Sequence, residues 1–263
     1  MIYLPNGELH VPTSPKSSGY PSAKIQDHKR FFEGEVLRFG VVSDTHFGST
    51  KERVEEVVEA YQVFKREGIR VVYHAGDIVA GIKVYRGQEN ELKVWGMTNQ
   101  GDHVVKDYPK VEGIVTYFIA GNHCLSFLKE SGADVCAYIA DRRPDLVYLD
   151  QIQATIEIAP NIKVMLWHPA GGGASYALSY KGQRMINSLE GGSKPNILIS
   201  GHYHVSFYMN YRNINFLQTG CFEYQTLFLK ALGLMPSCSA WLVTARVNGD
   251  SIVRFQPEEI KWY

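Results

Sequence analysis

The sequence predicts a fold of the α/β class, and three observations support this prediction. Short apolar, β-branched runs alternate with segments whose apolar residues recur at helical spacing. Between residues 35 and 77 the order is strand-like run, helical segment, strand-like run, which is the order of a βαβ unit. Several strand-like runs also end in Asp, Asn or His. Because parallel strands of such a unit end at the same sheet edge, these polar residues are expected to meet there.

The chain begins with a segment that has few regular patterns. Residues 1–34 are rich in Pro, Ser, Gly and Lys, and residues 12–22 (PTSPKSSGYPS) are expected to be loop or extended chain. We therefore predict a loop-rich N-terminal extension over residues 1–34. One domain is expected over residues 35–263, a length that a single domain can reach.

The first half of this domain is predicted to contain three strands. Residues 35–44 (EVLRFGVVSD) form an apolar run with a polar tip, and residues 52–68 place apolar side chains on one helical face before a Gly. Residues 69–77 and 114–122 are predicted to be two further strands with polar ends. Residues 80–110 are weakly patterned, and we expect a loop with one or two helices there.

The second half alternates in the same way and then becomes rich in strands. Residues 125–140 are predicted to be helical with an interruption near Gly132, and residues 175–192 have a second helical pattern. Residues 205–256 are strand-rich, with a hairpin turn expected at residues 247–251 (VNGDS). Further short strands are expected at residues 146–150, 153–159, 161–169 and 196–204.

Composition and charge argue against several classes of protein and of metal site. The 27 basic and 27 acidic residues give a formal net charge of zero, so no global field draws the chain to nucleic acid or an anionic membrane. The four cysteines form no C-x-x-C pair, which argues against a disulfide framework or a thiolate zinc site. The N-terminus lacks the pattern of a secretory signal, and no window is apolar enough to span a membrane. We therefore expect a cytoplasmic protein with no membrane partner.

Five strand-like segments end in groups that bind metals. They are SDTH (43–46), AGD (75–77), GNH (121–123), WHP (167–169) and GHYH (201–204). Each follows an apolar run, so the five segments can converge on one pocket although they lie far apart in the chain. The candidate metal ligands that they supply are Asp44, His46, Asp77, Asn122, His168, His202 and His204.

These ligand types suit a pair of divalent cations. Imidazole nitrogen and hard oxygen, without thiolate, fit Mn²⁺, which we expect, and also Fe, Zn or Ni. A carboxylate has two oxygens, so a single Asp can bridge both ions. Two ions about 3.5–4 Å apart can clamp the attacking and leaving oxygens of phosphoryl transfer. A water between them readily loses a proton to give hydroxide at neutral pH.

The order D-x-H, G-D, G-N-H, a lone His and G-H-x-H resembles the motif order of the calcineurin-like metallophosphoesterases. The resemblance covers residues 37 to about 220. It implies a four-layer α-β-β-α sandwich with the metals at one sheet edge, in which residues 205–256 supply much of the second sheet. It also implies that the insertion at residues 80–110 forms one wall of the pocket.

The same resemblance implies a division of labour among the candidate residues. Asp77 would bridge the two metals. His123 would be the unligated histidine that stabilises charge on the phosphate or protonates the leaving oxygen, a role that suits a pKa near working pH. Asp44, His46 and His204 would hold the first metal, and Asn122, His168 and His202 the second.

Two departures from the family pattern matter. Cys124 follows G-N-H where the family usually has an acidic residue, so another group must orient His123. The Ser/Thr protein phosphatases of this superfamily carry G-D-x-V-D-R-G, whereas residues 76–82 are GDIVAGI, without the Arg and its neighbouring Asp. This difference argues against a protein phosphatase.

Aromatic and basic residues near the motifs are candidate substrate contacts. Tyr85 and Arg86 follow Asp77, and Tyr176 and Lys181 follow a run of glycines. Arg and Lys complement phosphate, and Tyr can stack on a base. A solvated helix face and an aromatic core are the alternative explanations for these residues.

The leading interpretation is a phosphodiesterase that hydrolyses a nucleotide or nucleic-acid diester by attack of a metal-bridging hydroxide, with DNA, RNA or a nucleotide as partner. A nuclease resembling the Mre11/SbcD group is one form of it, although no basic excess is present to follow a phosphate backbone. The alternatives are a phosphomonoesterase acting on a small metabolite and a non-catalytic interaction scaffold on the same fold. The sequence leaves the natural substrate and the oligomeric state open.

Overall fold

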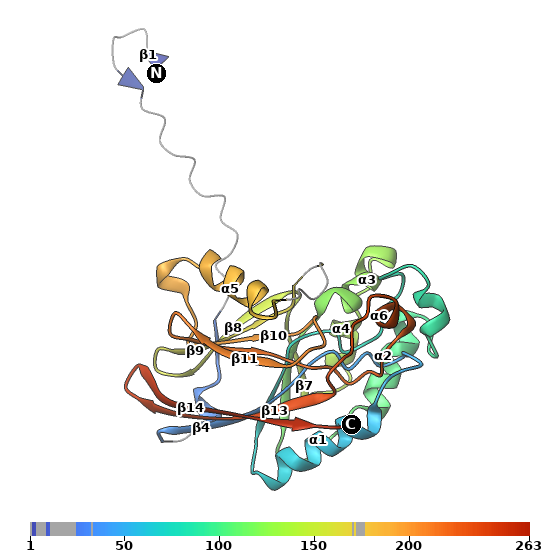
Figure 1. Ribbon diagram of the computed structural model, residues 1–263, viewed down its shortest axis with the longest axis horizontal. Helices are drawn as coiled ribbons and strands as arrows, with labels where there is room; N and C mark the ends of the chain where they lie inside the picture. The colour runs from blue at the N-terminus through green and yellow to red at the C-terminus, as the bar shows by residue number, and fades with distance from the viewer. Residues whose placement is uncertain (1, 4–8, 11–24, 33, 170, 172–176) are drawn as a thin grey trace.

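The computed structural model describes residues 2–3, 9–10, 25–32, 34–169, 171 and 177–263. Two six-stranded sheets lie face to face, and helices cover their outer faces (Figure 1). Near the N-terminus, β1 (Ile2–Tyr3) and β2 (Leu9–His10) pair with each other in antiparallel fashion.

The first sheet is built around the predicted βαβ unit. β4, β5, β6 and β7 run parallel to one another, and β13 joins β4 in antiparallel fashion. The strands predicted in the first half of the chain are therefore present. In spatial order the sheet consists of β14 (Ser251–Lys261), β13 (Ser239–Asn248), β4 (Val36–Val42), β5 (Val71–His74), β6 (Val115–Ile119) and β7 (Leu146–Asp150).

Four helices lie against the outer face of the first sheet. Tyr61 and Phe64 from the first of them pack with Val72 and Phe118 of the sheet in one buried cluster. The interruption predicted near Gly132, within residues 125–140, is confirmed. Gly132 ends one helix at a φ of 72°, and Asp134 caps the next. The helices are α1 (Val54–Arg66), α2 (Met97–Asp107), α3 (Gly121–Ser131) and α4 (Val135–Ala140), with the short 3₁₀ helix η2 (Gln88–Glu91) preceding α2.

The second sheet combines parallel and antiparallel pairs. β10 pairs in parallel with both β9 and β12. Leu198 of β10 and Phe216 of β12 pack against Ile186 of α5 (Ser179–Ser188) on the outer face of this sheet. The 3₁₀ helix η3 (Gly191–Ser193) precedes β10. In spatial order the sheet consists of β11 (Phe207–Tyr211), β12 (Ile214–Gln218), β10 (Ile197–Ser200), β9 (Ile162–Trp167), β8 (Gln153–Ala159) and β3 (Gln26–Asp27).

The main core lies between the two sheets. Phe39 and Val41 of β4 face Val164 and Leu166 of β9 and Ile199 of β10 in a buried apolar cluster. From top to bottom, Figure 1 shows α5, the second sheet, the first sheet and α1. The expected four-layer α-β-β-α sandwich is therefore confirmed.

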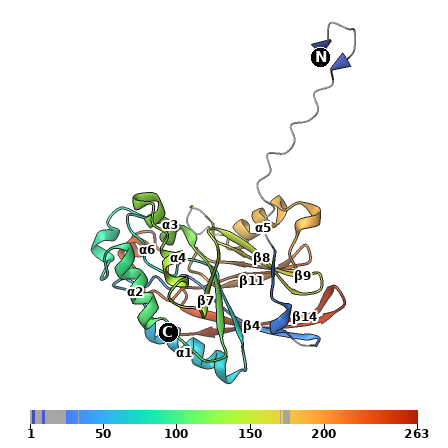
Figure 2. The same ribbon diagram turned by 180° about the vertical axis from the view of Figure 1, so that it is seen from behind.

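The C-terminal strands depart from the expectation in one respect. Residues 205–256 were expected to supply much of the second sheet, but only β11 and β12 belong to it. β13 and β14 instead extend the first sheet beside β4, joined by the predicted hairpin turn between Asn248 and Ser251. A short helix, α6 (Leu227–Ala231), lies between β12 and β13 and was not predicted. Figure 2 shows α6 at the same end of the sheets as α2 and α3.

Part of the predicted N-terminal extension contacts the sandwich. β3 pairs in parallel with β8, and the 3₁₀ helix η1 (Lys29–Phe31) follows it. Phe31 and Phe32 pack against the core between the sheets, and His28 is buried against Tyr73 and Tyr117. The domain boundary at residue 35 stays a prediction. Across the described residues, every helix is too short or too polar to cross a bilayer.

Candidate metal centre

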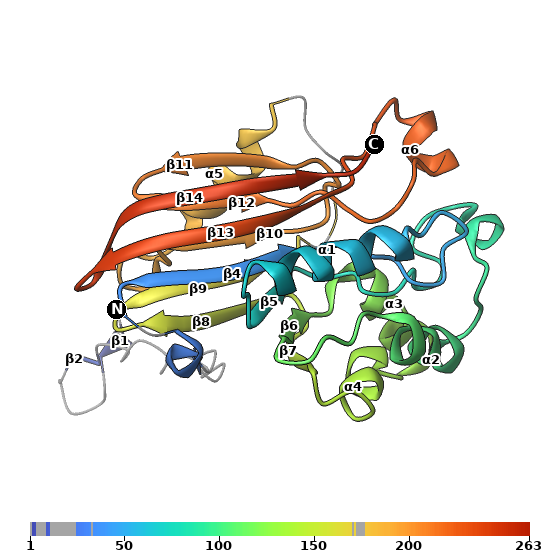
Figure 3. The same cartoon turned by 90° about the horizontal axis from the view of Figure 1, so that it is seen from below.

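The candidate ligands lie just beyond the carboxyl ends of strands from both sheets. The segments that carry them meet at the end of the sandwich where α2, α3 and α6 also lie (Figure 3). In chain order these residues are Asp44 and His46 after β4, Asp77 after β5, Asn122 after β6, His168 after β9, and His202 and His204 after β10.

The backbone at these positions is unusual. A non-glycine residue with positive φ costs about 1–3 kcal/mol and persists only where its surroundings hold it. Such strain is typical of functional sites. The candidate ligands with positive φ are Asp44 at 51°, His46 at 45°, Asp77 at 58°, His202 at 81° and His204 at 57°.

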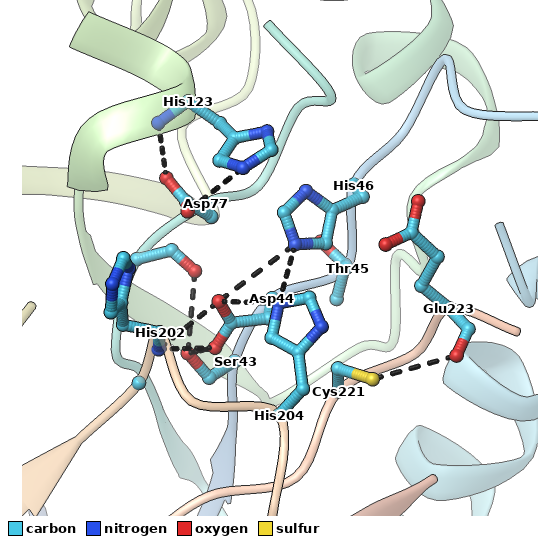
Figure 4. A network of polar contacts seen from close by, with 12 residues as sticks. Ser43, Asp44, Thr45, His46, Asp77, His123, His202, His204, Cys221 and Glu223 are labelled. Carbon is cyan, nitrogen blue, oxygen red and sulfur yellow. Dashed lines mark hydrogen bonds and ion pairs between the residues drawn. The ribbon is translucent and has the colours of Figure 1, made fainter. Parts of the chain in front are cut away.

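The first group of converging atoms comes from Asp44, His46 and His204. Nε2 of His204 lies 3.3 Å from Oδ1 of Asp44, and Nε2 of His46 lies 3.8 Å from the same oxygen. The two imidazole nitrogens are 3.0 Å apart. On its other side, Asp44 accepts hydrogen bonds from the hydroxyl of Ser43 at 2.5 Å and from the backbone N–H of His202 (Figure 4). This carboxylate is thus held in place while one oxygen faces two histidines.

The second group comes from Asp77, His168, His202 and Asn122. Nε2 of His168 lies 3.0 Å from Oδ2 of Asp77 and 3.1 Å from Oδ1 of Asn122. Nδ1 of His202 lies 2.8 Å from the same oxygen of Asn122. The amide oxygen therefore lies between two imidazoles, one of which also faces the carboxylate.

A third group links the other two. His46, Asp77 and His123 offer ligand atoms that all lie within 4.8 Å of one another. His46 also belongs to the first group, and Asp77 also belongs to the second. His46 and Asp77 therefore join the three groups into one continuous cluster.

The arrangement of the second group fits a bound cation. Nδ1 of His168 donates a hydrogen bond to the carbonyl of Ala75 at 2.7 Å. In a neutral imidazole that hydrogen bond leaves Nε2 as an acceptor, and Nε2 then faces two further acceptors on Asp77 and Asn122. Three acceptors at such short distances need a cation or a proton between them.

The pKa values of His168 and Asp77 show that the second group favours a positive charge. Burial would lower the pKa of His168, but the carboxylates of Asp77 and Asp44 outweigh burial and raise it to about 9. Burial would likewise raise the pKa of Asp77, but the neighbouring histidines, His168 foremost, lower it below its usual range. A divalent cation among these atoms would take the place of the proton.

Glycines allow the ligand loops to approach one another. A Cβ added to Gly76 would overlap the imidazole of His168, and Gly76 also has a φ of 104°. A Cβ added to Gly201 would overlap the side chains of Ser43 and Asp44. No other residue type fits at either position without moving a candidate ligand.

His123 is oriented by the backbone. Its Nδ1 donates to the carbonyl of Ala80 at 2.6 Å, and its backbone N–H donates to Oδ1 of Asp77 at 2.8 Å. Its Nε2 lies 4.0 Å from Oδ2 of Asp77 (Figure 4). The carbonyl of Ala80 thus orients His123 in place of the acidic residue that is missing at position 124. Cys124 of α3 is buried in an apolar cluster.

A cavity of about 290 Å³ opens beside the centre. Asn122, His123, His202 and His204 form one side of it. Val84 and Tyr85 lie on another side, so the insertion at residues 80–110 contributes to the wall.

The four candidate substrate contacts lie in different places. Tyr85 lines the cavity, and its hydroxyl donates to Oε2 of Glu91 at 2.7 Å. Arg86 is exposed and lines no cavity described for this part of the chain. Lys181 lines a neighbouring cavity of about 360 Å³ instead. Tyr176 lies outside the described residues.

Sequence reasoning missed two groups beside the centre. Cys221 and Glu223 lie next to His204 and His46 in Figure 4, and Glu223 lines the cavity. Glu223 is buried and accepts a hydrogen bond from the hydroxyl of Ser49 at 2.5 Å. Both residues lie beyond the end of β12, by three and five positions, so only a search that extended past the strand-end residues would have found them.

Comparison with known proteins gives distant sequence relatives. The chain is 25% identical to the DNA polymerase II small subunit of Methanothermobacter thermautotrophicus, over 79% of this chain and 48% of that protein. It is 27% identical to the protein of the same name from Methanocaldococcus jannaschii, over 82% of this chain and 43% of that protein. The chain thus spans about half the length of the curated relatives it matches.

Comparison with solved structures gives distant matches. A novel archaeal phosphodiesterase has a TM-score of 0.47 and 12% identity, covering 85% of this chain and all of the other. YfcE, a phosphoesterase from E. coli, has a TM-score of 0.42 and 12% identity, covering 84% of this chain and 98% of the other.

The family model of the calcineurin-like phosphoesterase superfamily domain matches residues 37–227. This range contains every segment of the cluster described above, from Asp44 to His204, and about three quarters of the chain. The chain therefore belongs to the calcineurin-like phosphoesterase superfamily.

Proposed function

We propose that the protein is a metal-dependent phosphodiesterase with a dinuclear centre. The observation that carries this proposal is the position of Asp77, whose carboxylate belongs to two of three overlapping groups of potential ligand atoms. Membership of a phosphoesterase superfamily supports the same chemistry.

The proposed ligand sets follow the three groups. Asp44, His46 and His204 would hold one cation, Asn122, His168 and His202 the other, and Asp77 both. When bound, a pair of divalent cations activates a water nucleophile and neutralises charge on the phosphate. The mixture of imidazole and oxygen ligands supports Mn²⁺ as the first choice, with Fe, Zn or Ni as alternatives.

His123 is proposed to act on the leaving side of the phosphate. It lines the cavity, and its Nδ1 is engaged by Ala80, so its Nε2 faces the centre. From there it can stabilise charge on a phosphate oxygen or donate a proton to the departing alkoxide.

The charge of the cavity favours a diester over a monoester. A phosphomonoester carries close to two negative charges at pH 7, whereas a diester carries one. Among the described residues that line the cavity there is no Lys or Arg to balance the second charge of a monoester. A singly charged ester bearing a second organic group is therefore the better match, and nucleotide, DNA and RNA diesters all meet this condition.

A pair of chromogenic substrates tests the proposal. Metal-stripped protein should be inactive and should regain hydrolysis of bis(4-nitrophenyl) phosphate on addition of Mn²⁺, with at least tenfold lower efficiency on 4-nitrophenyl phosphate. Asp77→Asn should abolish this activity, whereas Asp102→Asn, at an exposed residue of α2, should not. A tenfold preference for the monoester, or turnover that does not depend on added metal, would reject the diesterase.

A second candidate function is that of a subunit in a larger assembly. The observation that favours it is that curated relatives from several archaea are each named a DNA polymerase II small subunit. A pure scaffold on this fold predicts no turnover with any divalent metal. The substrate pair described above therefore separates the two candidates.

A further inference from the structure

The cavity beside the proposed centre has two chemically different sides. One side consists of polar groups of the centre, including His123 and His204. The apolar side consists of Phe228 and Leu229 of α6 and of Leu232 and Leu234 just after it. A ligand in this cavity would have one end among histidines and the other against aliphatic and aromatic carbon.

The apolar side is fixed to the rest of the molecule by specific contacts. The hydroxyl of Thr226 caps α6 by accepting from the backbone N–H of Leu229 at 3.2 Å. Oε1 of the buried Glu91 accepts from the backbone N–H of Leu227 at 2.5 Å. Its other oxygen accepts from the hydroxyl of Tyr85. The apolar wall is therefore anchored to the insertion between residues 80 and 110.

Aromatic stacking completes this wall. The ring of Tyr85 stacks on the ring of Phe228 with centroids 4.5 Å apart and an angle of 20° between their planes. The same Tyr85 ring lies 6.4 Å from the ring of His123. Tyr85 therefore connects the apolar wall to the residue proposed to act on the leaving group.

The wall is apolar yet open to solvent. Phe228 is 40% exposed and Leu232 is 53% exposed, although both line a cavity next to a buried polar cluster. A ligand that covered this carbon would be stabilised by removing it from water. An apolar group on the substrate would cover it.

Basic side chains lie outside this cavity. Lys181 and Arg184 line the neighbouring cavity, which shares Gly171 and Tyr203 with the first. A nucleic-acid strand is held mainly by Lys and Arg along its successive phosphates. The described lining of this cavity offers no Lys or Arg to hold a second phosphate.

We propose that this cavity binds an uncharged, apolar or aromatic group esterified to the phosphate, so that the substrate is a small organic diester and not a nucleic-acid strand. The proposal rests on the proposed phosphodiesterase function. Leu232 acts as a residue that determines specificity, because it covers the organic group and makes no contact with the reacting atoms.

Two leucines of the same segment provide a matched test with bis(4-nitrophenyl) phosphate. Leu232→Ala should raise KM about fivefold and leave kcat within twofold, because one methyl-rich surface against the aryl group is lost. Leu232→Met should restore KM. Leu227→Ala should leave both constants unchanged, because Leu227 is 68% exposed and is not part of the described lining.

Each outcome bears on the proposal. An unchanged KM in Leu232→Ala, or equal effects of Leu227→Ala and Leu232→Ala, would overturn it while the phosphodiesterase function stood. A single-stranded oligonucleotide hydrolysed more efficiently than the aryl diester would also overturn it. Absence of metal-dependent hydrolysis in the wild type would remove the phosphodiesterase function, and this inference with it.

Discussion

Single residues in the centre are held by contacts that leave one ligand atom facing the cluster. His168 donates from Nδ1 to Ala75, and His123 donates from Nδ1 to Ala80. Asp44 accepts from Ser43 while its Oδ1 faces His204. Such outer contacts fix the tautomer and the ring orientation before a metal arrives. The strained backbone at Asp44 and Asp77 serves the same end, because it aims short side chains across the loops.

The first prediction concerns His123. Because His123 lines the cavity and is assigned to neither proposed metal, His123→Ala should keep both metals and lose about 10²- to 10⁴-fold in kcat. Metal content measured by atomic absorption and kcat on bis(4-nitrophenyl) phosphate would check both parts. Asn122→Ala should instead lower the metal content. Wild-type turnover by His123→Ala would show that the histidine has no part in the chemistry.

The second prediction concerns Gly76. Gly76→Ala would push a Cβ into the imidazole of His168, so metal affinity should fall by about 10- to 100-fold. Gly68→Ala is the matched control, because Gly68 also has positive φ, at 69°, but has open space around it. The control should lose about 1–2 kcal/mol of stability through backbone strain and keep its metal affinity. Titration of the stripped proteins with Mn²⁺ would compare them, and equal affinities would contradict the proposed position of His168 in the centre.

At the scale of elements, α2 is tied to the loop before α1 by a histidine between two carboxylates. Nε2 of His103 lies 2.7 Å from Oε1 of Glu52, and its Nδ1 lies 2.8 Å from Oδ2 of Asp107. Lys93 lies 2.6 Å from the same oxygen of Glu52. Only the imidazolium can donate to both carboxylates, and the hydrogen bond to Glu52 raises the pKa of His103 above its usual value.

The third prediction is the pH dependence of this contact. Because the folded-state pKa of His103 is raised, its stabilising contribution is complete below about pH 6.5 and is lost as the pH rises through the raised value. His103→Gln should therefore lower the free energy of unfolding by about 1 kcal/mol at pH 6 and by less at pH 9. Urea denaturation at the two pH values would measure this difference. If the difference in free energy of unfolding between wild type and His103→Gln were larger at pH 9 than at pH 6, the assignment would be contradicted.

The elements themselves were largely predictable, and the exceptions have physical reasons. β4 and β5 are short apolar runs bounded by polar residues, so their period and their ends were visible in the sequence. The helix α6 was missed because its residues LFLKA are apolar on more than one side and it remains exposed. A helix without a buried face leaves no periodic pattern, so sequence reasoning finds no signal for it.

At the scale of the whole molecule, the meeting of distant segments was predictable from one rule. Parallel strands end at a common edge, so Asp44 and Asp77 had to be neighbours once β4 and β5 paired. The sheet to which β13 belongs was not predictable in this way. Its pairing with β4 joins residues about 200 positions apart, and a strand pattern alone does not specify its partner. Glu223 was missed because it lies five residues beyond β12, outside the strand-end motifs.

The last prediction concerns where the folded unit begins. Phe31 and Phe32 pack on the core between the sheets and belong to none of the groups of candidate metal ligands. The double variant Phe31→Ala/Phe32→Ala should therefore lower stability by about 2–4 kcal/mol, and Tm by roughly 5–10 °C. Turnover at 25 °C should stay within twofold of the wild type. Ile25→Ala, at a residue that is 46% exposed, is the control and should leave Tm unchanged. If the double variant had the same Tm as the wild type, the folded unit would begin near residue 35. The contacts of Phe31 and Phe32 would then contribute nothing to its stability.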